Sequence, residues 1–133
     1  MAIAFSVSGN PVPQPRPRVS TRGGFARAYV PKTHAVHAYR KAIAAAARDA
    51  GAGVHGEPVE VVIDLIFERP KSHLRKRGLA KDAPATPRPD LDNCAKAVLD
   101  ALNGVAWDDD AQVQRLVVSK TYGTEARTTV RIS

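Results

Sequence analysis

Alternation of apolar and polar side chains predicts four β-strands in this chain. Near the N-terminus, apolar residues alternate with small ones over residues 3–7, and a Gly-Asn-Pro sequence at 9–11 ends the run. Residues 59–68 carry the clearest pattern, because every odd-numbered position is apolar and acids occupy even-numbered positions. Two further strands are expected over residues 113–120 and 126–132, and the Tyr-Gly-Thr-Glu turn between them indicates a hairpin. The alternation is typical of a sheet with one buried face.

Two other stretches have apolar residues at spacings of three and four, which predicts amphipathic helices. The first helix follows Thr33, a suitable N-cap, and ends at Gly51. The second covers residues 91–102 and is closed by Asn103-Gly104. The resulting order, β-α-β-α-β-β, predicts a single α+β domain over residues 1–133, in which both helices cover one face of a mixed sheet of about four strands.

Two basic, proline-containing segments interrupt this pattern. Residues 11–31 combine prolines, arginines and a Gly-Gly pair, and they predict an extended arm or long loop. Residues 69–89 form the second basic loop. Loops of this length without secondary structure usually carry function, so both segments are candidate binding elements.

Composition limits the class of protein. The chain has 133 residues, of which 44% are hydrophobic and 25% are charged, as expected of one globular domain. A single cysteine, Cys94, excludes a disulfide within the chain and a zinc site built from several cysteines. The first residues show no signal-peptide pattern, and no apolar stretch approaches the ~20 residues of a membrane span. We therefore expect a soluble protein of a reducing compartment.

Charge is distributed unevenly along the chain. The 20 Lys and Arg residues outweigh 13 Asp and Glu residues, which gives a net charge of +7. Residues 1–41 contain basic groups and no acid, residues 69–88 contain basic groups with Asp82 alone, and residues 90–110 concentrate aspartates. Basic segments favour a polyanion such as nucleic acid, and a bound divalent cation would relieve the repulsion between aspartates and phosphates. The alternative is that the basic segments are solvated loops and the acids a solubilising patch.

The residues around the start of the second helix could hold such a cation. Leu91 lies between Asp90 and Asp92, so both carboxylates can point one way while Leu91 points into the core. Asp92 and Lys96 are four residues apart and are therefore neighbours on the helix surface. If the strand that follows the acidic segment 107–112 lies beside the helix start, its carboxylates join this group. Such a cluster would suit one or two Mg²⁺ or Mn²⁺ ions.

Each of these residues also has a purely structural interpretation. The two aspartates can cap the helix, Lys96 can form an exposed ion pair, and the acids at 108–110 can form a solvated turn. Trp107 is expected to anchor the core, and Cys94 is expected to be an inert core thiol. Spacing alone does not choose between these interpretations and a metal site.

Two acidic segments together resemble one protein family. The RusA family of Holliday-junction resolvases has a pattern similar to residues 89–102, Pro-Asp-Leu-Asp-Asn-x-x-Lys-Ala-x-x-Asp-Ala-Leu, and to residues 107–113, Trp-Asp-Asp-Asp-Ala-Gln-Val. Residues 9–19, 28–31 and 69–74 resemble its phage and Gram-positive branch. The resemblance implies a homodimeric, Mg²⁺-dependent endonuclease of the bacterial or phage-infected cytoplasm. Such an enzyme resolves four-way DNA junctions by paired symmetrical incisions during recombination, repair or phage DNA processing.

The resemblance also implies roles for individual residues. The family's essential acids match Asp90, Asp92 and Asp110, its catalytic lysine matches Lys96, and a further metal-binding acid matches Asp109. Which of the acids at 108–110 bind Mg²⁺, or Mn²⁺ in its place, stays open. We expect the two basic loops to bind DNA phosphates through Arg16, Arg18, Arg69, Lys71, Arg75, Lys76, Arg77 and Arg88.

Two other functions stay open on the sequence alone. One is a metal-dependent nuclease for other branched DNA, and the other is a nucleic-acid-binding module without catalysis. Neither a small-molecule cofactor nor a membrane is expected as a partner.

Overall fold

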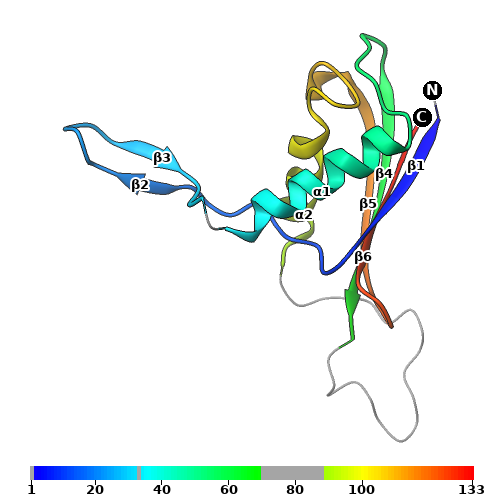
Figure 1. Cartoon of the computed structure of the whole chain (residues 1–133), viewed down its shortest axis with the longest axis horizontal. Helices are drawn as coiled ribbons and strands as arrows, with labels where there is room; N and C mark the ends of the chain where they lie inside the picture. The colour runs from blue at the N-terminus through cyan, green and yellow to red at the C-terminus, as the bar shows by residue number, and fades with distance from the viewer. Residues whose placement is uncertain (1, 33, 70–88) are drawn as a thin grey trace, which may run out of the picture.

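A four-stranded sheet and two helices make up the body of the molecule (Figure 1). The computed structural model describes residues 2–32, 34–69 and 89–133. In chain order the elements are β1 (Ile3–Ser8), β2 (Arg18–Ser20), β3 (Arg27–Tyr29), α1 (Ala35–Asp49), β4 (Val59–Glu68), α2 (Leu91–Leu102), the 3₁₀ helix η2 (Asp110–Gln112), β5 (Val113–Gly123) and β6 (Arg127–Ile132). The predicted α+β fold with the order β-α-β-α-β-β is confirmed for the body, and the short strands β2 and β3 are additional.

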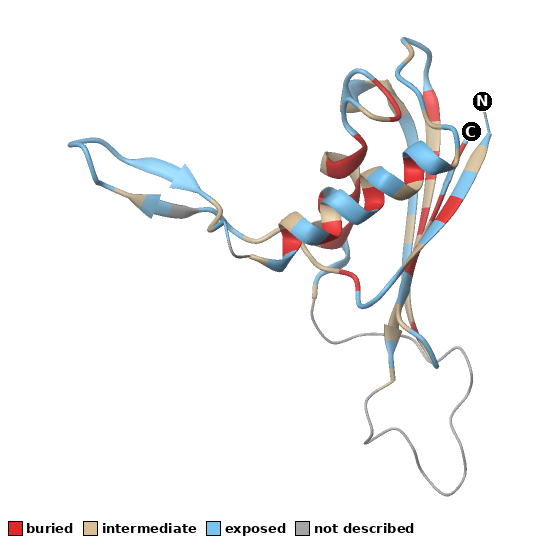
Figure 2. Ribbon diagram, viewed as in Figure 1, coloured by how far each residue is buried: buried red, intermediate tan, exposed pale blue. Residues whose placement is uncertain are grey.

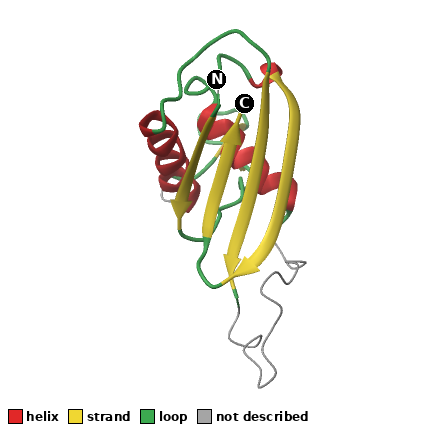
Figure 3. Ribbon diagram, turned by 90° about the vertical axis from the view of Figure 1, so that its right-hand side faces the viewer, coloured by secondary structure: helices red, strands yellow, loops and turns green. Residues whose placement is uncertain are grey.

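The main sheet is mixed, with the strand order β1-β6-β4-β5. β4 and β5 run parallel, whereas β6 is antiparallel to both of its neighbours, β1 and β4. Both helices lie against the same face of this sheet (Figure 3). The predicted placement of the helices on one face is therefore confirmed.

The core lies between the sheet and the two helices (Figure 2). Burial alternates along β4, as the sequence pattern predicts, because Val61, Ile63 and Leu65 are fully buried and their neighbours are partly exposed. Trp107 is also fully buried, which confirms its expected role as a core anchor. The helices contribute further fully buried side chains, namely Val36, Ile43, Ala47, Cys94, Ala97, Val98 and Leu102.

The helix ends agree closely with the sequence pattern. Thr33 lies outside the described residues, and the N-cap of α1 is His34, whose Nδ1 accepts a hydrogen bond from the N–H of Val36 (3.0 Å). Gly51 and Gly104 follow the two helices with positive φ values, as the predicted helix ends require. In the described part of the chain, neither helix is long and apolar enough to cross a membrane.

The predicted hairpin between the last two strands is wrong. β5 and β6 are not neighbours, because β4 lies between them. In this position β6 forms hydrogen bonds with a strand on each side, which satisfies more of its backbone groups than a terminal hairpin would. The turn after β5 has to cross the end of β4, and a Cβ built on Gly123 would lie only 2.7 Å from Cγ2 of Ile66.

The predicted arm at residues 11–31 is present, and it ends in a hairpin that the sequence pattern does not indicate. β2 and β3 pair antiparallel, with Arg18 opposite Tyr29 and Ser20 opposite Arg27. This hairpin extends away from the body (Figure 1). The segment is therefore a short β-ribbon at the end of an extended chain.

Replacing Gly123 with Ala is expected to lower the free energy of unfolding by roughly 1–3 kcal/mol, because the new Cβ must displace the Ile66 side chain. Urea denaturation followed by circular dichroism measures this change. Gly53→Ala is the matched control, since a Cβ at that position meets no atom within 4 Å. Equal stability of the two variants would contradict the close approach at the crossing.

Candidate active site

The connection from β4 through α2 to β5 places the start of α2 at one end of the sheet. Because β4 and β5 are parallel, the helix between them has to run back in the opposite direction. The first turn of α2 therefore lies at the end of the sheet where both strands finish. Lys120, near the end of β5, contacts this region by donating from Nζ to the carbonyl oxygen of Pro89 (3.0 Å).

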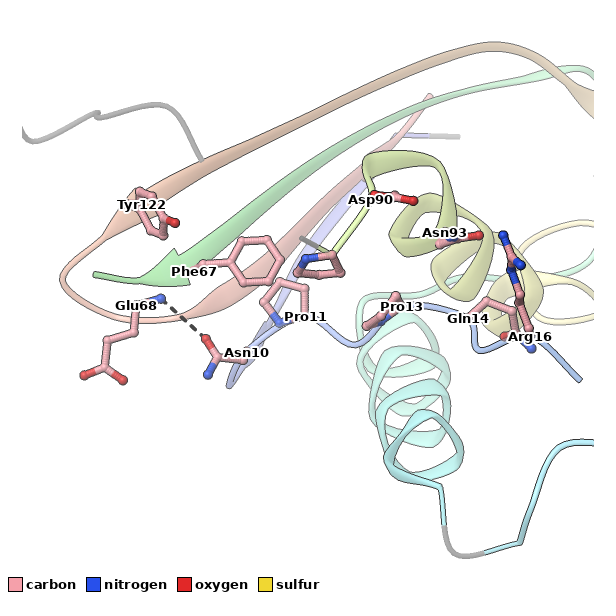
Figure 4. A pocket seen from close by; sticks show the side chains of 11 residues that line it. Asn10, Pro11, Pro13, Gln14, Arg16, Phe67, Glu68, Asp90, Asn93 and Tyr122 are labelled. Carbon is pink, nitrogen blue, oxygen red and sulfur yellow. Dashed lines mark hydrogen bonds between the residues drawn. The ribbon is translucent and has the colours of Figure 1, made fainter. Parts of the chain in front are cut away.

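A cavity of about 970 Å³ opens at this end of the sheet. Its walls come from the segment before β2, the ends of β4 and β5, and the start of α2 (Figure 4). The segment before β2 is fixed at two points. The N–H of Gln14 donates to the carbonyl oxygen of Asn93 (2.9 Å), and Oδ1 of Asn10 accepts from the N–H of Glu68 (3.4 Å). Of the residues that the structure describes, the charged ones lining this cavity are Arg16, Glu68 and Asp90.

Two carboxylates of the predicted site lie at the start of α2. Asp90 is the N-cap residue, and its side chain makes no capping hydrogen bond, so both of its carboxylate oxygens are free of the helix backbone. Asp92 lies in the first turn, where its Oδ1 accepts a hydrogen bond from the N–H of Asn93 (3.0 Å). Both aspartates are exposed. Their carboxylates are therefore accessible to a ligand.

Leu91 does not point into the core, as the sequence analysis expects, because its side chain is 37% exposed. The buried stripe of α2 starts at Cys94 and Ala95. The first turn of the helix extends past the packed core, so an apolar residue at its first position stays in contact with solvent.

Two lysines bring positive charge close to these carboxylates. Lys96 follows Asp92 by one helical turn and is exposed, as the spacing predicts. Lys120 is not one of the predicted site residues, although it contacts the residue before Asp90. The sequence gives only a weak indication that Lys120 belongs to the site. Lys120 is a charged residue in β5 two positions before the buried Tyr122, and it therefore lies on the same face of the strand.

Cys94 lies directly behind this turn and is fully buried, which confirms the expectation of a core thiol. Burial raises the pKa of its thiol to about 11; the nearby Lys120 opposes this increase, and the charges of Asp90 and Asp92 add to it. The thiol is therefore protonated at neutral pH and is a poor nucleophile. Asp90 and Asp92 belong to this end of α2, and Lys120 contacts the residue before Asp90.

The acids at 108–110 follow the other end of α2, where two of them stabilise a tight turn. Asp109 caps η2, and its Oδ1 accepts a hydrogen bond from the N–H of Ala111 (3.0 Å). Asp110 is half-buried, and its Oδ1 accepts from the indole N–H of Trp107 (2.8 Å). The solvated-turn interpretation therefore applies to the exposed Asp108 and Asp109, whereas the half-buried Asp110 packs against Trp107.

Gln112 fixes this turn to the opposite end of the sheet. Its amide donates to the carbonyl oxygens of His55 (2.6 Å) and Glu57 (2.9 Å), which both precede β4. The acids at 109 and 110 consequently lie where β4 and β5 begin, whereas Asp90 lies where they finish.

The two groups of carboxylates therefore do not meet within one chain. They are separated by α2, whose 12 residues span about 18 Å. The expectation that the acidic segment joins the helix start is wrong for a single chain, because a β-α-β connection brings the end of the second strand there and not its beginning. Within the described residues, no group of three Asp, Glu, His or Cys side chains is placed to hold a metal ion.

Asp90 and Asp92 nevertheless fit part of a site for a hard divalent cation. Mg²⁺ takes oxygen ligands, keeps several waters, and is commonly held by one or two carboxylates together with substrate phosphates. Two exposed carboxylates beside a cavity that also contains Arg16 supply donors of this kind. The assignment of the predicted site residues to catalysis or metal binding stays a prediction.

The structure places three of the predicted phosphate-binding residues. Arg16 lines the cavity, Arg18 begins the first strand of the arm, and Arg69 follows β4, where its N–H donates to the carbonyl oxygen of Gly123 (3.1 Å). These basic segments thus depart from the end of the sheet that carries Asp90. The other predicted residues, Lys71, Arg75, Lys76, Arg77 and Arg88, lie outside the described residues.

Residues 8–133 match the protein family described as "Endodeoxyribonuclease RusA". The chain belongs to the RusA endodeoxyribonuclease family. This confirms the resemblance drawn from the two acidic segments, and it makes the functional class that of a DNA-cleaving hydrolase. The chain is also 35% identical over 135 residues to YqaN, an uncharacterized protein of Bacillus subtilis (strain 168), with 98% of this chain and 94% of that protein covered. A relative in Bacillus agrees with the Gram-positive branch of the RusA family.

In this RusA-family chain, the buried thiol is expected to make stability fall at alkaline pH. The pKa of Cys94 is raised from 9.0 to about 11 on folding, so its stabilising contribution is complete below pH 9 and is lost as the pH rises towards 11. The full loss is roughly 1–3 kcal/mol. Urea denaturation at neutral pH and at about pH 10 measures the decrease.

Cys94→Ala is the comparison for this measurement, because it removes the titrating group and should lose less stability over the same pH range. Tyr39, whose pKa burial raises to about 12 with a smaller contribution from Cys94, is present in both proteins. An equal decrease in the two proteins would contradict the assignment to Cys94.

Proposed function

We propose that this RusA-family chain resolves four-way DNA junctions by paired, Mg²⁺-dependent cleavage of phosphodiester bonds, in recombination, repair or phage DNA processing. The main support is the start of α2, where the exposed carboxylates of Asp90 and Asp92 stand beside a cavity lined by Arg16. Carboxylates bind a divalent cation and an arginine binds phosphate, so this region can hold both partners of the hydrolysis.

The residues around the cavity would have separate roles in the reaction. Asp90 and Asp92 would hold Mg²⁺, which supplies Lewis-acid activation of the phosphate and of water when bound. Lys96, one turn from Asp92, would counter the negative charge that develops on the phosphate oxygens. Arg16 would hold a phosphate of the bound strand against the cavity wall. Lys120 would keep the start of α2 in position through its hydrogen bond to Pro89.

We also propose a homodimer in which each copy completes the site of the other. β5 is an edge strand of 11 residues, and its Leu116 and Val117 are 40% and 41% exposed. Antiparallel pairing of two β5 edges about a twofold axis would bring the beginning of one strand to the end of the other. Asp110 of one copy would then lie near Asp90 of the second copy. Two equivalent sites also suit a junction, which has approximate twofold symmetry.

Asp92→Asn is expected to lower the cleavage rate of a synthetic four-way junction by more than about 100-fold, because loss of a metal ligand costs more than loss of a residue that supports one. Binding without a divalent cation should be retained, since the change removes a charge that repels phosphate. Gel assays on junction, fork and duplex DNA of matched sequence, with and without Mg²⁺, measure both effects. Asp100→Asn, on the same helix, is the matched control.

The possible results of these assays separate the open functions. Cleavage of forks as fast as junctions would indicate a nuclease for branched DNA in general. Binding with no Mg²⁺-dependent cleavage of any substrate would indicate a non-catalytic module. Normal turnover of Asp92→Asn would remove Asp92 from the site.

Mixing two inactive variants tests whether the site is shared between copies. Asp92→Asn and Asp110→Asn should each be inactive, but a mixed dimer contains one site with both native aspartates. The mixture is therefore expected to recover up to about a quarter of the native nicking activity under random pairing, because half of the dimers are mixed and each has one intact site of two. The products should be single nicks in place of paired cuts. The amide at position 110 can still accept the Trp107 hydrogen bond, so folding is preserved. No recovery after subunit exchange would show that the two residues act within one chain or in separate roles.

A further inference from the structure

The β2–β3 hairpin continues directly from the wall of the cavity. Arg16 lines the cavity, and β2 begins two residues later at Arg18. The hairpin then extends away from the body of the molecule (Figure 1), and every residue from 21 to 29 is exposed. A molecule bound along the hairpin would therefore also pass the cavity.

The charge of this segment fits a polyanion. Residues 1–48 contain no Asp or Glu, and the segment from 16 to 32 carries Arg16, Arg18, Arg22, Arg27 and Lys32. Such a concentration of cations on an exposed ribbon favours binding to nucleic-acid phosphates. Binding of an apolar protein surface would not require this concentration of positive charge.

The tip of the hairpin carries an exposed aromatic ring. Gly23 and Gly24 turn the chain with φ values of 87° and 86°, and Phe25 follows with its side chain 56% exposed. The guanidinium carbon of Arg27 lies 4.7 Å from the centre of the Phe25 ring. Arginine in this position restrains the ring, so that its other face can contact a flat ligand.

An aromatic ring beside an arginine is suited to a nucleic-acid base. Aromatic side chains stack on bases whose faces are exposed, and cations bind the phosphates next to them. In a continuous duplex each base face is covered by its neighbour. At a branch point the stack is interrupted, so base faces become accessible.

We propose that Phe25 stacks on a base exposed at the branch point of the DNA, and that this contact provides part of the preference for branched over linear DNA. The inference rests on the proposed function and adds a residue that determines specificity. From Arg18 to the turn at Gly23 the ribbon extends about 17 Å, which equals about five steps along a DNA strand. The branch point would therefore lie within about five nucleotides of a phosphate held at the cavity.

Phe25→Ala tests the contact, because Phe25 is exposed and its loss should leave the fold intact. The ratio of duplex to junction Kd, measured without divalent cations to prevent cleavage, is expected to fall by about 5- to 100-fold. Phe25→Trp should keep the ratio. Val19→Ala is the matched control, since it removes another exposed apolar side chain of the same hairpin (69% exposed).

A fluorescent base analogue, 2-aminopurine, gives a second measurement of the same contact. Placed at the branch point, it should change in fluorescence when the native chain or Phe25→Trp binds, and much less when Phe25→Ala binds. At a position well inside a duplex arm it should respond equally to all three proteins.

The outcomes distinguish this inference from the proposed function. If the native chain binds junction and duplex equally, the inference fails, whereas the proposed function fails only if the native chain also leaves junctions uncut in the presence of Mg²⁺. If the native chain prefers junctions and Phe25→Ala keeps both that preference and the fluorescence change, only the inference is overturned. Equal weakening of junction and duplex binding, or a loss of self-association with an unchanged Kd ratio, would likewise overturn it.

Discussion

The parallel pairing of β4 and β5 is the constraint on which the rest of this structure depends. Neighbouring parallel strands need a crossover, and α2 supplies it by running back along the sheet. The crossover buries the apolar side of α2 in the core, where the helix contacts α1 and β5. Because α2 runs back along the sheet, the residues before α2 and the residues before β5 lie at opposite ends of the molecule. The separation of Asp90 from Asp110 follows from this topology and not from local side-chain conformations.

The end of the sheet where β4 and β5 finish combines groups of opposite charge. The exposed carboxylates of Asp90 and Asp92 are flanked by Lys120 and by Arg16, and the basic arm departs from the same place. Carboxylates in such a position would repel a nucleic acid unless a cation lay between them and the phosphates. A cation held there, as proposed above, would account for acids beside the cavity of a strongly basic chain.

Sequence periodicity predicts an element correctly when one face of that element is buried in the core. The odd-numbered residues of β4 and the apolar stripe of α2 face the core, so their periods of two and near 3.6 are visible in the sequence. The β2–β3 hairpin has no buried face, so no alternation marks it. The placement of β6 between β1 and β4, and the contact of Lys120 with Pro89, join residues far apart in the chain. Periodicity contains no information about such contacts, which is why the hairpin of β5 and β6 was predicted wrongly and why the separation of the acids within one chain was not foreseen.

The hydrogen bond between Trp107 and Asp110 limits what position 110 can tolerate. Trp107 is fully buried, and its indole N–H needs an acceptor that Asp110 provides. A side chain without an acceptor there would leave a buried donor unsatisfied, at a cost of about 1–3 kcal/mol, whatever its effect on catalysis. The identity of this residue is thus set by the interior of the protein as well as by any cation at its surface. An alanine or leucine variant at position 110 loses this acceptor. Its inactivity therefore indicates a catalytic role only after its folding has been measured.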